Sequence, residues 1–152
     1  MELESEVIKP GKPYSRICLG VLGKREDISQ EAMRDKVLHP ILAVLGKVPD
    51  IVYMPSDGTS SAVIGAWTDR CEINNEMIHA DFRKLGRRAF AMRDARILKD
   101  ASDILVFEQP KSEYLVKLAI REMKKGKRIF SVSAGKNWEL QQWEEDTTCT
   151  ID

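Results

Sequence analysis

The chain has 152 residues, with 24 Lys and Arg against 24 Asp and Glu, so its formal net charge is zero. This length corresponds to one ordinary domain, and the zero charge excludes a protein that coats nucleic acid or anionic membrane non-specifically, because both need a positive excess. Hydrophobic residues make up 43% of the chain and charged residues 32%, which is typical of a soluble globular protein with a single core.

The three cysteines lie far apart without a CxxC pair, and there are only two histidines. We therefore expect neither a disulfide framework nor a metal site, and the sequence implies no cofactor. No segment reaches the roughly 18 apolar residues of a membrane helix, and the acidic start is unlike a signal peptide. These features predict a cytoplasmic protein without a membrane partner.

The first predicted elements are a flexible arm over residues 1–14 and a buried strand over the apolar run 16–22. Asp27 predicts the start of a helix of the capping-box kind. Apolar residues then recur every three to four positions, which is the spacing of one helical face. Pro40 should kink or split this helix, and Gly46 is expected to end it.

A second buried strand is predicted over residues 50–54, followed by the polar, turn-rich stretch 55–61. Either Thr59 or Ser60 is expected to cap the helix that follows this stretch. A third strand is predicted within residues 72–80, although two asparagines lie near its centre.

The second half of the chain continues the alternation. It predicts a helix over 86–100, a strand over 103–107, a helix that begins near Leu115 and ends before Gly126, and a strand over 128–132. Basic residues in the last turn before Gly126 suit the negative end of the helix dipole.

Strands that alternate with helices, and that are apolar throughout, predict a parallel sheet covered on both faces. The fold class is therefore α/β, a small doubly wound, Rossmann-like, mostly parallel five-stranded sheet over residues 15–134. The acidic tail 135–152 is expected to form a short amphipathic helix on the domain or to contact a partner. Ligands of such sheets bind beyond the carboxyl ends of the strands, near the point where strand order reverses. This rule selects the loops 23–27, 55–61 and 108–112.

The loop after the second strand is a candidate anion site. Backbone N–H groups at a helix start, together with small hydroxyl side chains and a glycine, suit phosphate, but the same residues also form an ordinary strand-to-helix turn. The loop matches neither a Walker motif nor GxGxxG. Its candidate ligand-binding residues are Ser56, Asp57, Gly58, Thr59 and Ser60.

The segment Arg83–Lys99 holds seven basic residues against one acid, which gives it a local charge of +6. A solvated helix face is the simpler interpretation. However, Arg93 lies three residues before Arg96 and six after Arg87, so these side chains cannot all point to solvent together with Arg88. At least one arginine is expected to face inward, where it needs an anionic partner.

Two further loops carry candidate residues. Gly23, Lys24 and Arg25 follow the first strand, and their place near the reversal of strand order favours a ligand role. Glu108 and Glu113 flank the loop after the fourth strand, where a carboxylate can bind a ribose hydroxyl, act as an acid or base, or simply lie in water.

The block from Ala80 to Asp94, with Leu85-Gly86-Arg87-Arg88-Ala89 at its centre, resembles a block of the SLOG superfamily of Rossmann-like proteins. It is similar to a branch of small uncharacterised proteins with an aromatic, Gly-Arg-x-Ala and Arg-Asn pattern before an apolar helix. The run Ala101–Phe107 fits the strand that follows in that branch, and Gly23-Lys24-Arg25 resembles its first turn. The resemblance covers about residues 16–132, and the superfamily also includes folds related to lonely-guy phosphoribohydrolases and DNA-processing protein A.

The chain also departs from the family pattern. Asp94 stands where an Asn is expected, and the family's glycine-rich loop is reduced to Gly58 among hydroxyl residues. The Pro-Gly-Gly-x-Gly-Thr loop of the phosphoribohydrolases is missing from residues 108–113, which argues against hydrolysis. The resemblance implies a nucleotide-derived ligand held through its phosphate and ribose.

The leading hypothesis is a domain that binds a nucleotide-derived small molecule, to sense or sequester it. The loop after the second strand would hold phosphate together with Lys24 and Arg25. Arg93 would pair with phosphate or orient the site, Asp94 would also belong to the ligand-binding residues, and Glu108 would contact ribose.

Two alternatives stay open. The first is a nucleotide N-glycoside hydrolase or deoxyribosyltransferase with Glu108 or Glu113 as nucleophile or general acid. The second is an interaction module whose basic Arg83–Lys99 face binds nucleic acid or an acidic partner, with nucleic acid not favoured. We also expect the chain to form a homo-oligomer.

Overall fold

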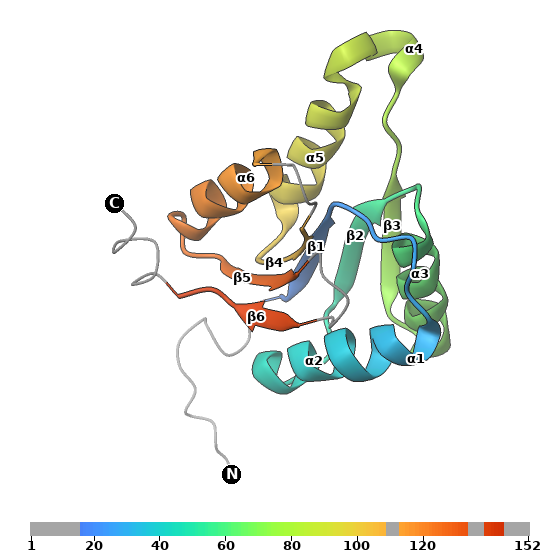
Figure 1. The fold of residues 1–152 in the computed structure, drawn as a ribbon, viewed down its shortest axis with the longest axis vertical. Coiled ribbons are helices and arrows are strands. Elements are labelled where there is room, and N and C mark those ends of the chain that lie inside the picture. Colours follow the sequence, from blue (N-terminus) through green and yellow to red (C-terminus); the bar gives the residue numbers. More distant parts are fainter. Residues whose placement is uncertain (1–15, 109–112, 134–138, 145–152) are drawn as a thin grey trace.

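The computed structural model describes residues 16–108, 113–133 and 139–144. The predicted arm 1–14 and most of the tail lie outside the described residues. Figure 1 shows the elements, which in chain order are β1 (Cys18–Leu22), α1 (Gln30–Ala32), the π-helix η2 (Met33–Leu38), α2 (His39–Leu45), β2 (Ile51–Pro55), α3 (Thr59–Arg70), β3 (Asn74–Ile78), α4 (Phe82–Leu85), the 3-10 turn η3 (Gly86–Arg88), α5 (Ala89–Asp100), β4 (Asp103–Phe107), α6 (Tyr114–Met123), β5 (Arg128–Val132) and β6 (Leu140–Gln142).

The sheet has the strand order β3-β2-β1-β4-β5-β6. Strands β1 to β5 are parallel, and β6 pairs with β5 in the antiparallel direction. The doubly wound α/β fold is therefore confirmed, with six strands rather than five. The chain first builds the sheet outward from β1 to β3 and then returns to place β4 on the other side of β1. The order thus reverses between β1 and β4.

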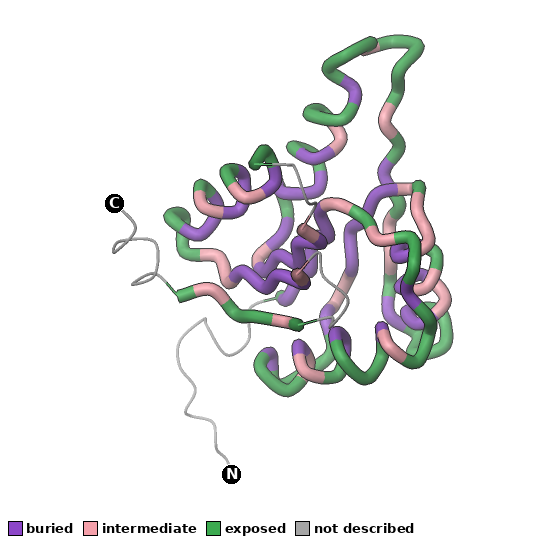
Figure 2. Tube along the Cα trace, viewed as in Figure 1, coloured by how far each residue is buried: buried purple, intermediate pink, exposed green. Residues whose placement is uncertain are grey.

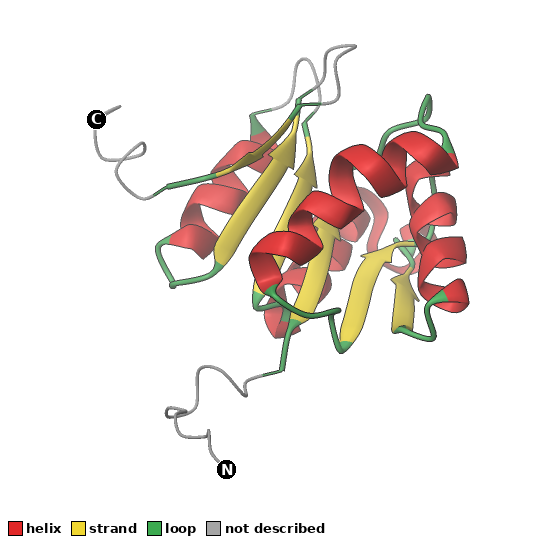
Figure 3. Ribbon diagram, turned by 90° about the horizontal axis from the view of Figure 1, so that it is seen from below, coloured by secondary structure: helices red, strands yellow, loops and turns green. Residues whose placement is uncertain are grey.

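Apolar strands form the centre because helices cover both faces of the sheet (Figure 3). Every residue of β1 and of β4 is buried, so neither strand shows alternation (Figure 2). The core lies in two layers. Met33, Ile41 and Ile64 belong to the layer under α1–α2 and α3, whereas Ile97 and Leu118 belong to the layer under α5 and α6. Each such side chain contributes about 1.5–3 kcal/mol by leaving water.

The first helix begins two residues later than its sequence predicts. The hydroxyl of Ser29 caps it by accepting from the N–H of Ala32 at 3.1 Å. The expected cap, Asp27, instead accepts a hydrogen bond from Nε of Arg25 at 2.8 Å. The Asp27 prediction was wrong because an arginine two residues away holds its carboxylate.

Pro40 interrupts the regular helix, as predicted. It lies in the first turn of α2, directly after the π-helical stretch η2. Proline has no N–H to donate and clashes with the preceding turn, so the wider π-helical turn accommodates it. Gly46 ends α2 with a φ of 81°, a left-handed conformation that suits glycine.

The helix expected over 86–100 has an additional turn before it. α4 begins at Phe82, where Oδ1 of Asp81 accepts from the N–H of Lys84 at 3.2 Å, and η3 joins α4 to α5. Residues 82–92, called the arm below, extend beyond the edge of the sheet (Figure 1). Within the arm only Ala89 is buried.

The tail was expected to form a helix or a partner contact, but its described part adds a strand to the sheet. The N–H of Trp143 donates to the carbonyl of Ile129 at 2.8 Å, and its indole Nε1 donates to Oγ of Ser131 at 2.8 Å. These bonds continue the backbone pairing of β5 and place a polar atom against the buried Ser131.

Candidate functional site

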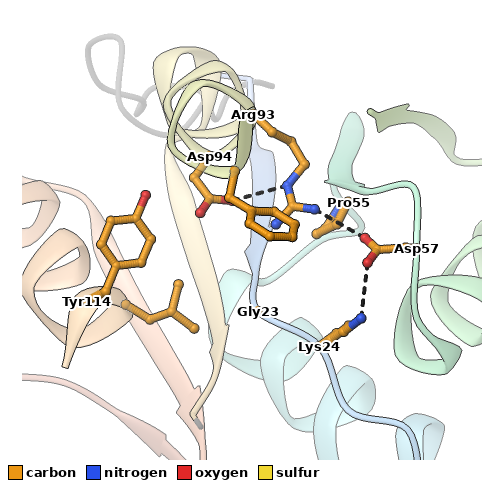
Figure 4. A pocket seen from close by; sticks show the side chains of 9 residues that line it. Gly23, Lys24, Pro55, Asp57, Arg93, Asp94 and Tyr114 are labelled. Carbon is orange, nitrogen blue, oxygen red and sulfur yellow. Dashed lines mark hydrogen bonds and ion pairs between the residues drawn. The ribbon is translucent and has the colours of Figure 1, made fainter. Parts of the chain in front are cut away.

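A pocket of about 370 Å³ lies at the carboxyl ends of β1 and β2, next to the reversal of strand order (Figure 4). Loops after β1 and β2 form one wall, and the first two turns of α5 and the first turn of α6 form the other. Its lining residues are Gly23, Lys24, Pro55, Asp57, Phe90, Arg93, Asp94, Tyr114 and Leu115.

Arg93 is the inward-facing arginine that the crowded basic segment predicts. Its side chain is only 9% exposed, and its Nη1 lies 3.1 Å from Oδ1 of Asp57. Its Nε lies 3.4 Å from Oδ1 of Asp94, and the guanidinium carbon is 4.9 Å from the centre of the Phe90 ring. Arg93 thus has two carboxylate partners and an aromatic face.

Asp57 joins the two cations of the pocket, because its other oxygen, Oδ2, accepts a hydrogen bond from Nζ of Lys24 at 3.1 Å (Figure 4). Burial by itself would raise the pKa of Asp57, but the hydrogen bond and charge of Lys24 and the charge of Arg93 hold that pKa below its usual value. The hydrogen bond to Asp57 and its charge in turn raise the pKa of Lys24. Asp57 is therefore a carboxylate at neutral pH.

Asp94 is the buried acid of the pocket, with a side chain only 3% exposed. Burial raises the pKa of Asp94, against the opposing effects of the Arg93 charge and of hydrogen bonds from Arg93 and Tyr114. Burial likewise raises the pKa of Tyr114, and the charge of Asp94 and the hydrogen bond to it add to that effect. The buried carboxyl group of Asp94, which is hydrogen-bonded to the phenol of Tyr114, is able to hold or transfer a proton at this position.

The start of α3 differs from the predicted phosphate cradle. The backbone N–H and the hydroxyl of Thr59 both donate to Oε1 of Glu26, at 3.1 and 2.9 Å. The N–H of Ser60 donates to the carbonyl of Arg25, and Oγ of Ser60 accepts from the N–H of Arg25 at 2.8 Å. Neither Thr59 nor Ser60 caps the helix, and Gly58 is its N-cap residue. The α3 N–H groups of Thr59 and Ser60 thus already bind protein oxygens.

Two glycines let the loops approach the pocket closely. Gly23 has a φ of +76°, and a Cβ atom there would lie 2.5 Å from the carbonyl oxygen of Phe107. Gly58 has a φ of +98°, and a Cβ atom there would lie 2.9 Å from Cδ of Lys24. Any larger residue at Gly58 would therefore displace Lys24 as well as strain the backbone.

Several predicted site residues lie away from this pocket. Oγ of Ser56 is 2.8 Å from Nδ1 of His79. The N–H of Glu108 donates to a carbonyl of β5, and its side chain is half-buried. Glu113 is exposed before α6, with an oxygen 3.9 Å from Nζ of Lys117. None of Ser56, Glu108 and Glu113 lines the pocket.

Arg25 also turns away from the pocket. Its Nη1 donates to the carbonyl oxygen of Ser133 at 2.8 Å, and its Nε bonds to Asp27. Arg25 therefore ties the loop after β1 to the end of β5, whereas its neighbours Gly23 and Lys24 line the pocket.

Sequence reasoning did not select Phe90, Tyr114 or Leu115, and it selected Pro55 only as part of the loop 55–61. Phe90 precedes Arg93 by three positions and Asp94 by four, so helical spacing places all three on one face and would have identified Phe90. Tyr114 and Leu115 begin α6, and no local pattern marks them as pocket residues.

Comparison of the chain with protein-family models, curated proteins and solved structures found no match. Within the described residues, no cluster of three or more His, Cys, Asp or Glu is placed to hold a metal ion. None of the described helices has the length and apolar character needed to cross a membrane.

Proposed function

We propose that the protein binds a nucleotide-derived small molecule in the pocket at the carboxyl ends of β1 and β2. The observation that carries this proposal is the buried Arg93 guanidinium, which lies in that pocket with Lys24 nearby. Arginine binds phosphate oxygens in a planar, two-pronged geometry, and the reversal of strand order is where doubly wound sheets hold such ligands.

The remaining lining suits the rest of a nucleotide. The rings of Phe90 and Tyr114 and the side chain of Leu115 offer apolar surface on which a base can stack. The volume of about 370 Å³ lies within the range of small-molecule sites, which is roughly 300–1,000 Å³. In this arrangement the phosphate lies against Lys24 and Arg93, and the base lies against the aromatic wall.

The test is calorimetric titration of nucleoside 5′-monophosphates into the wild type and an Arg93→Ala variant. The variant is expected to bind about tenfold or more weakly, because it loses a charge-assisted contact. Arg96→Ala is the matched control, since Arg96 lies on the same helix but is exposed and pairs with Glu76 at 2.8 Å. Equal affinity of the wild type and the Arg93→Ala variant for the nucleotide would show that Arg93 does not contact the ligand.

Asp94 favours a second candidate function, cleavage of the nucleotide N-glycosidic bond. In that reaction water adds to the anomeric carbon, the bond to the base breaks, and the base leaves with a proton. The buried Asp94, in contact with Tyr114, is a better-placed acid or base in the pocket than Glu108 or Glu113.

Chromatography of nucleotide incubated with the protein separates the two functions. Free base that accumulates with the wild type but not with Asp94→Asn would support the hydrolase. Intact nucleotide together with measurable binding would support the binding function alone. Glu108→Gln and Glu113→Gln, assayed in parallel, show whether the carboxylates expected from the sequence take part.

A further inference from the structure

The Asp57 carboxylate occupies the position between Lys24 and Arg93 where a ligand anion would lie (Figure 4). It bonds to Lys24 through one oxygen and to Arg93 through the other, both at 3.1 Å. Its side chain is 46% exposed, whereas that of Asp94 is 3% exposed. Asp57 can therefore rotate into water at small cost, while Asp94 cannot.

The charges of the pocket determine which anion replaces Asp57 favourably. Lys24 and Arg93 bring two positive charges, and the ionised Asp57 lies against both of them. A ligand with a single negative charge, such as a phosphodiester or a carboxylate, replaces the single charge of Asp57 with an equal one. Its binding therefore gains little electrostatic free energy. A phosphomonoester carries about −1.5 to −2 charges at neutral pH and also offers three acceptor oxygens, so it replaces Asp57 with a net gain.

We propose that Asp57 is an internal competitor that every ligand anion has to displace, so that a terminal phosphomonoester binds and singly charged anions bind only weakly. This inference rests on the proposed nucleotide-binding function and names the ligand class within it. The conformation of Gly58 next to Asp57 allows the loop to approach Lys24 closely, which keeps the competing carboxylate within reach of both cations.

The experiment compares adenosine 5′-monophosphate with its methyl ester, which has the same nucleoside and one charge fewer. Calorimetry at pH 7.5 is expected to show about tenfold tighter binding of the monophosphate to the wild type. Asp57→Asn is expected to bind both nucleotides about tenfold more tightly than the wild type does, because the cost of displacing Asp57 is the same for either ligand. Asp100→Asn, which removes an exposed carboxylate at the end of α5, should behave like the wild type.

A second measurement needs no variant. The second proton of a phosphomonoester binds with a pKa of about 6, so the wild-type preference should disappear as the pH falls below that value. The pKa of Asp57 is held below its usual value, so Asp57 stays ionised in this range. A preference that persists unchanged at pH 5 would overturn the inference.

The remaining outcomes separate this inference from the proposed function. If the wild type binds both nucleotides equally, or if Asp57→Asn weakens both, the inference is wrong and nucleotide binding stands. If neither nucleotide binds the wild type or Asp57→Asn, both fail. If inorganic phosphate binds as tightly as the nucleotide, selectivity for a phosphate dianion stands and the nucleotide part of the proposed function fails.

Discussion

Arg93 contacts Asp94, Asp57 and Phe90, and how far each of the two carboxylates is exposed to water determines its role in holding the guanidinium. Asp94 is almost fully covered, Asp57 is half exposed, and the Phe90 ring supports the guanidinium from one side. A covered carboxylate holds the arginine in place, because neither group can return to water without rearrangement of the helix. An exposed carboxylate leaves readily. The same side chain is therefore both fixed in position and open to exchange of one partner.

Asp94→Asn is expected to stabilise the protein at neutral pH by about 1 kcal/mol. Burial raises the pKa of Asp94 above the value of 3.8 that an unperturbed aspartate has. As the pH rises, Asp94 therefore ionises in the unfolded chain before it ionises in the folded protein. Above pH 3.8 the free energy of unfolding of the wild type then falls relative to that of the variant. Urea unfolding of both proteins between pH 4 and pH 8 should show a difference that grows with pH. A constant loss of stability in the variant would instead make Asp94 a structural residue.

At the residue scale, the sequence predicts that one arginine of the basic segment faces inward, but it does not predict which residue that arginine contacts. The spacing of Arg87, Arg93 and Arg96 requires an inward arginine because one helix cannot expose every side chain. Its partner Asp57 lies 36 residues away in the sequence, on a different loop. Local spacing carries no information on such a contact, which forms only when β2 and α5 pack side by side.

The start of α3 gives a prediction at the scale of a helix. Glu26 comes from the loop after β1 and binds the Thr59 N–H and hydroxyl, so it supplies the negative charge that the helix dipole favours. Glu26→Ala is expected to lower the melting temperature, whereas Glu144→Ala, an exposed acid without an ion pair to a described residue, should not.

The pH dependence of that effect has a defined sign. The hydrogen bonds from Thr59 lower the pKa of Glu26 below 4.5. Its contribution is therefore present above pH 4.5 and is lost as the pH falls through the lower, folded-state pKa. Melting curves of wild type and Glu26→Ala should converge at acid pH. A difference that stays constant down to pH 3 would show that the charge of Glu26 is not what stabilises α3.

The last strand, β6, gives a second prediction at this scale. Trp143→Phe removes the indole N–H from the hydroxyl of buried Ser131, and it is expected to cost about 1 kcal/mol of unfolding free energy. Ser131→Ala in the Trp143→Phe background should cost little more, because the bond is already lost. Denaturant unfolding of the two single variants and the double variant measures this coupling. Additive losses would mean that the bond contributes nothing.

Strands that are buried on both faces could be predicted from the sequence. Elements that form only through contacts with distant parts of the chain could not. β4 and β5 begin and end where their apolar runs predict, because burial on both faces demands such runs. β6 has the sequence Leu-Gln-Gln, which has no strand pattern and pairs only because β5 offers a free edge. The oxygen that accepts from the N–H of Thr59 belongs to Glu26 on another loop, so the local preference that selected Thr59 and Ser60 as caps could not identify it.

The whole molecule has no net charge, yet its charge is unevenly distributed. The arm carries Arg83, Lys84, Arg87 and Arg88, none of which forms an ion pair with a described residue. In the pocket, in contrast, both cations contact the carboxylate of Asp57. Zero net charge gives the molecule as a whole no long-range attraction for polyanions, and recognition in the pocket depends on short-range contacts. Self-association stays a prediction.

Hydrogen exchange across the whole chain tests where a ligand acts. The arm is exposed and its amides should exchange fast, whereas those of the buried strands should exchange slowly. Saturating adenosine 5′-monophosphate is expected to slow exchange at residues 89–94 about fivefold or more, because the ligand bridges Arg93 and the loop after β2. Residues 82–88 and α2 do not line the pocket, so their exchange rates should not change. Arg93→Ala should abolish the protection, and equal slowing in α2 would place the ligand elsewhere.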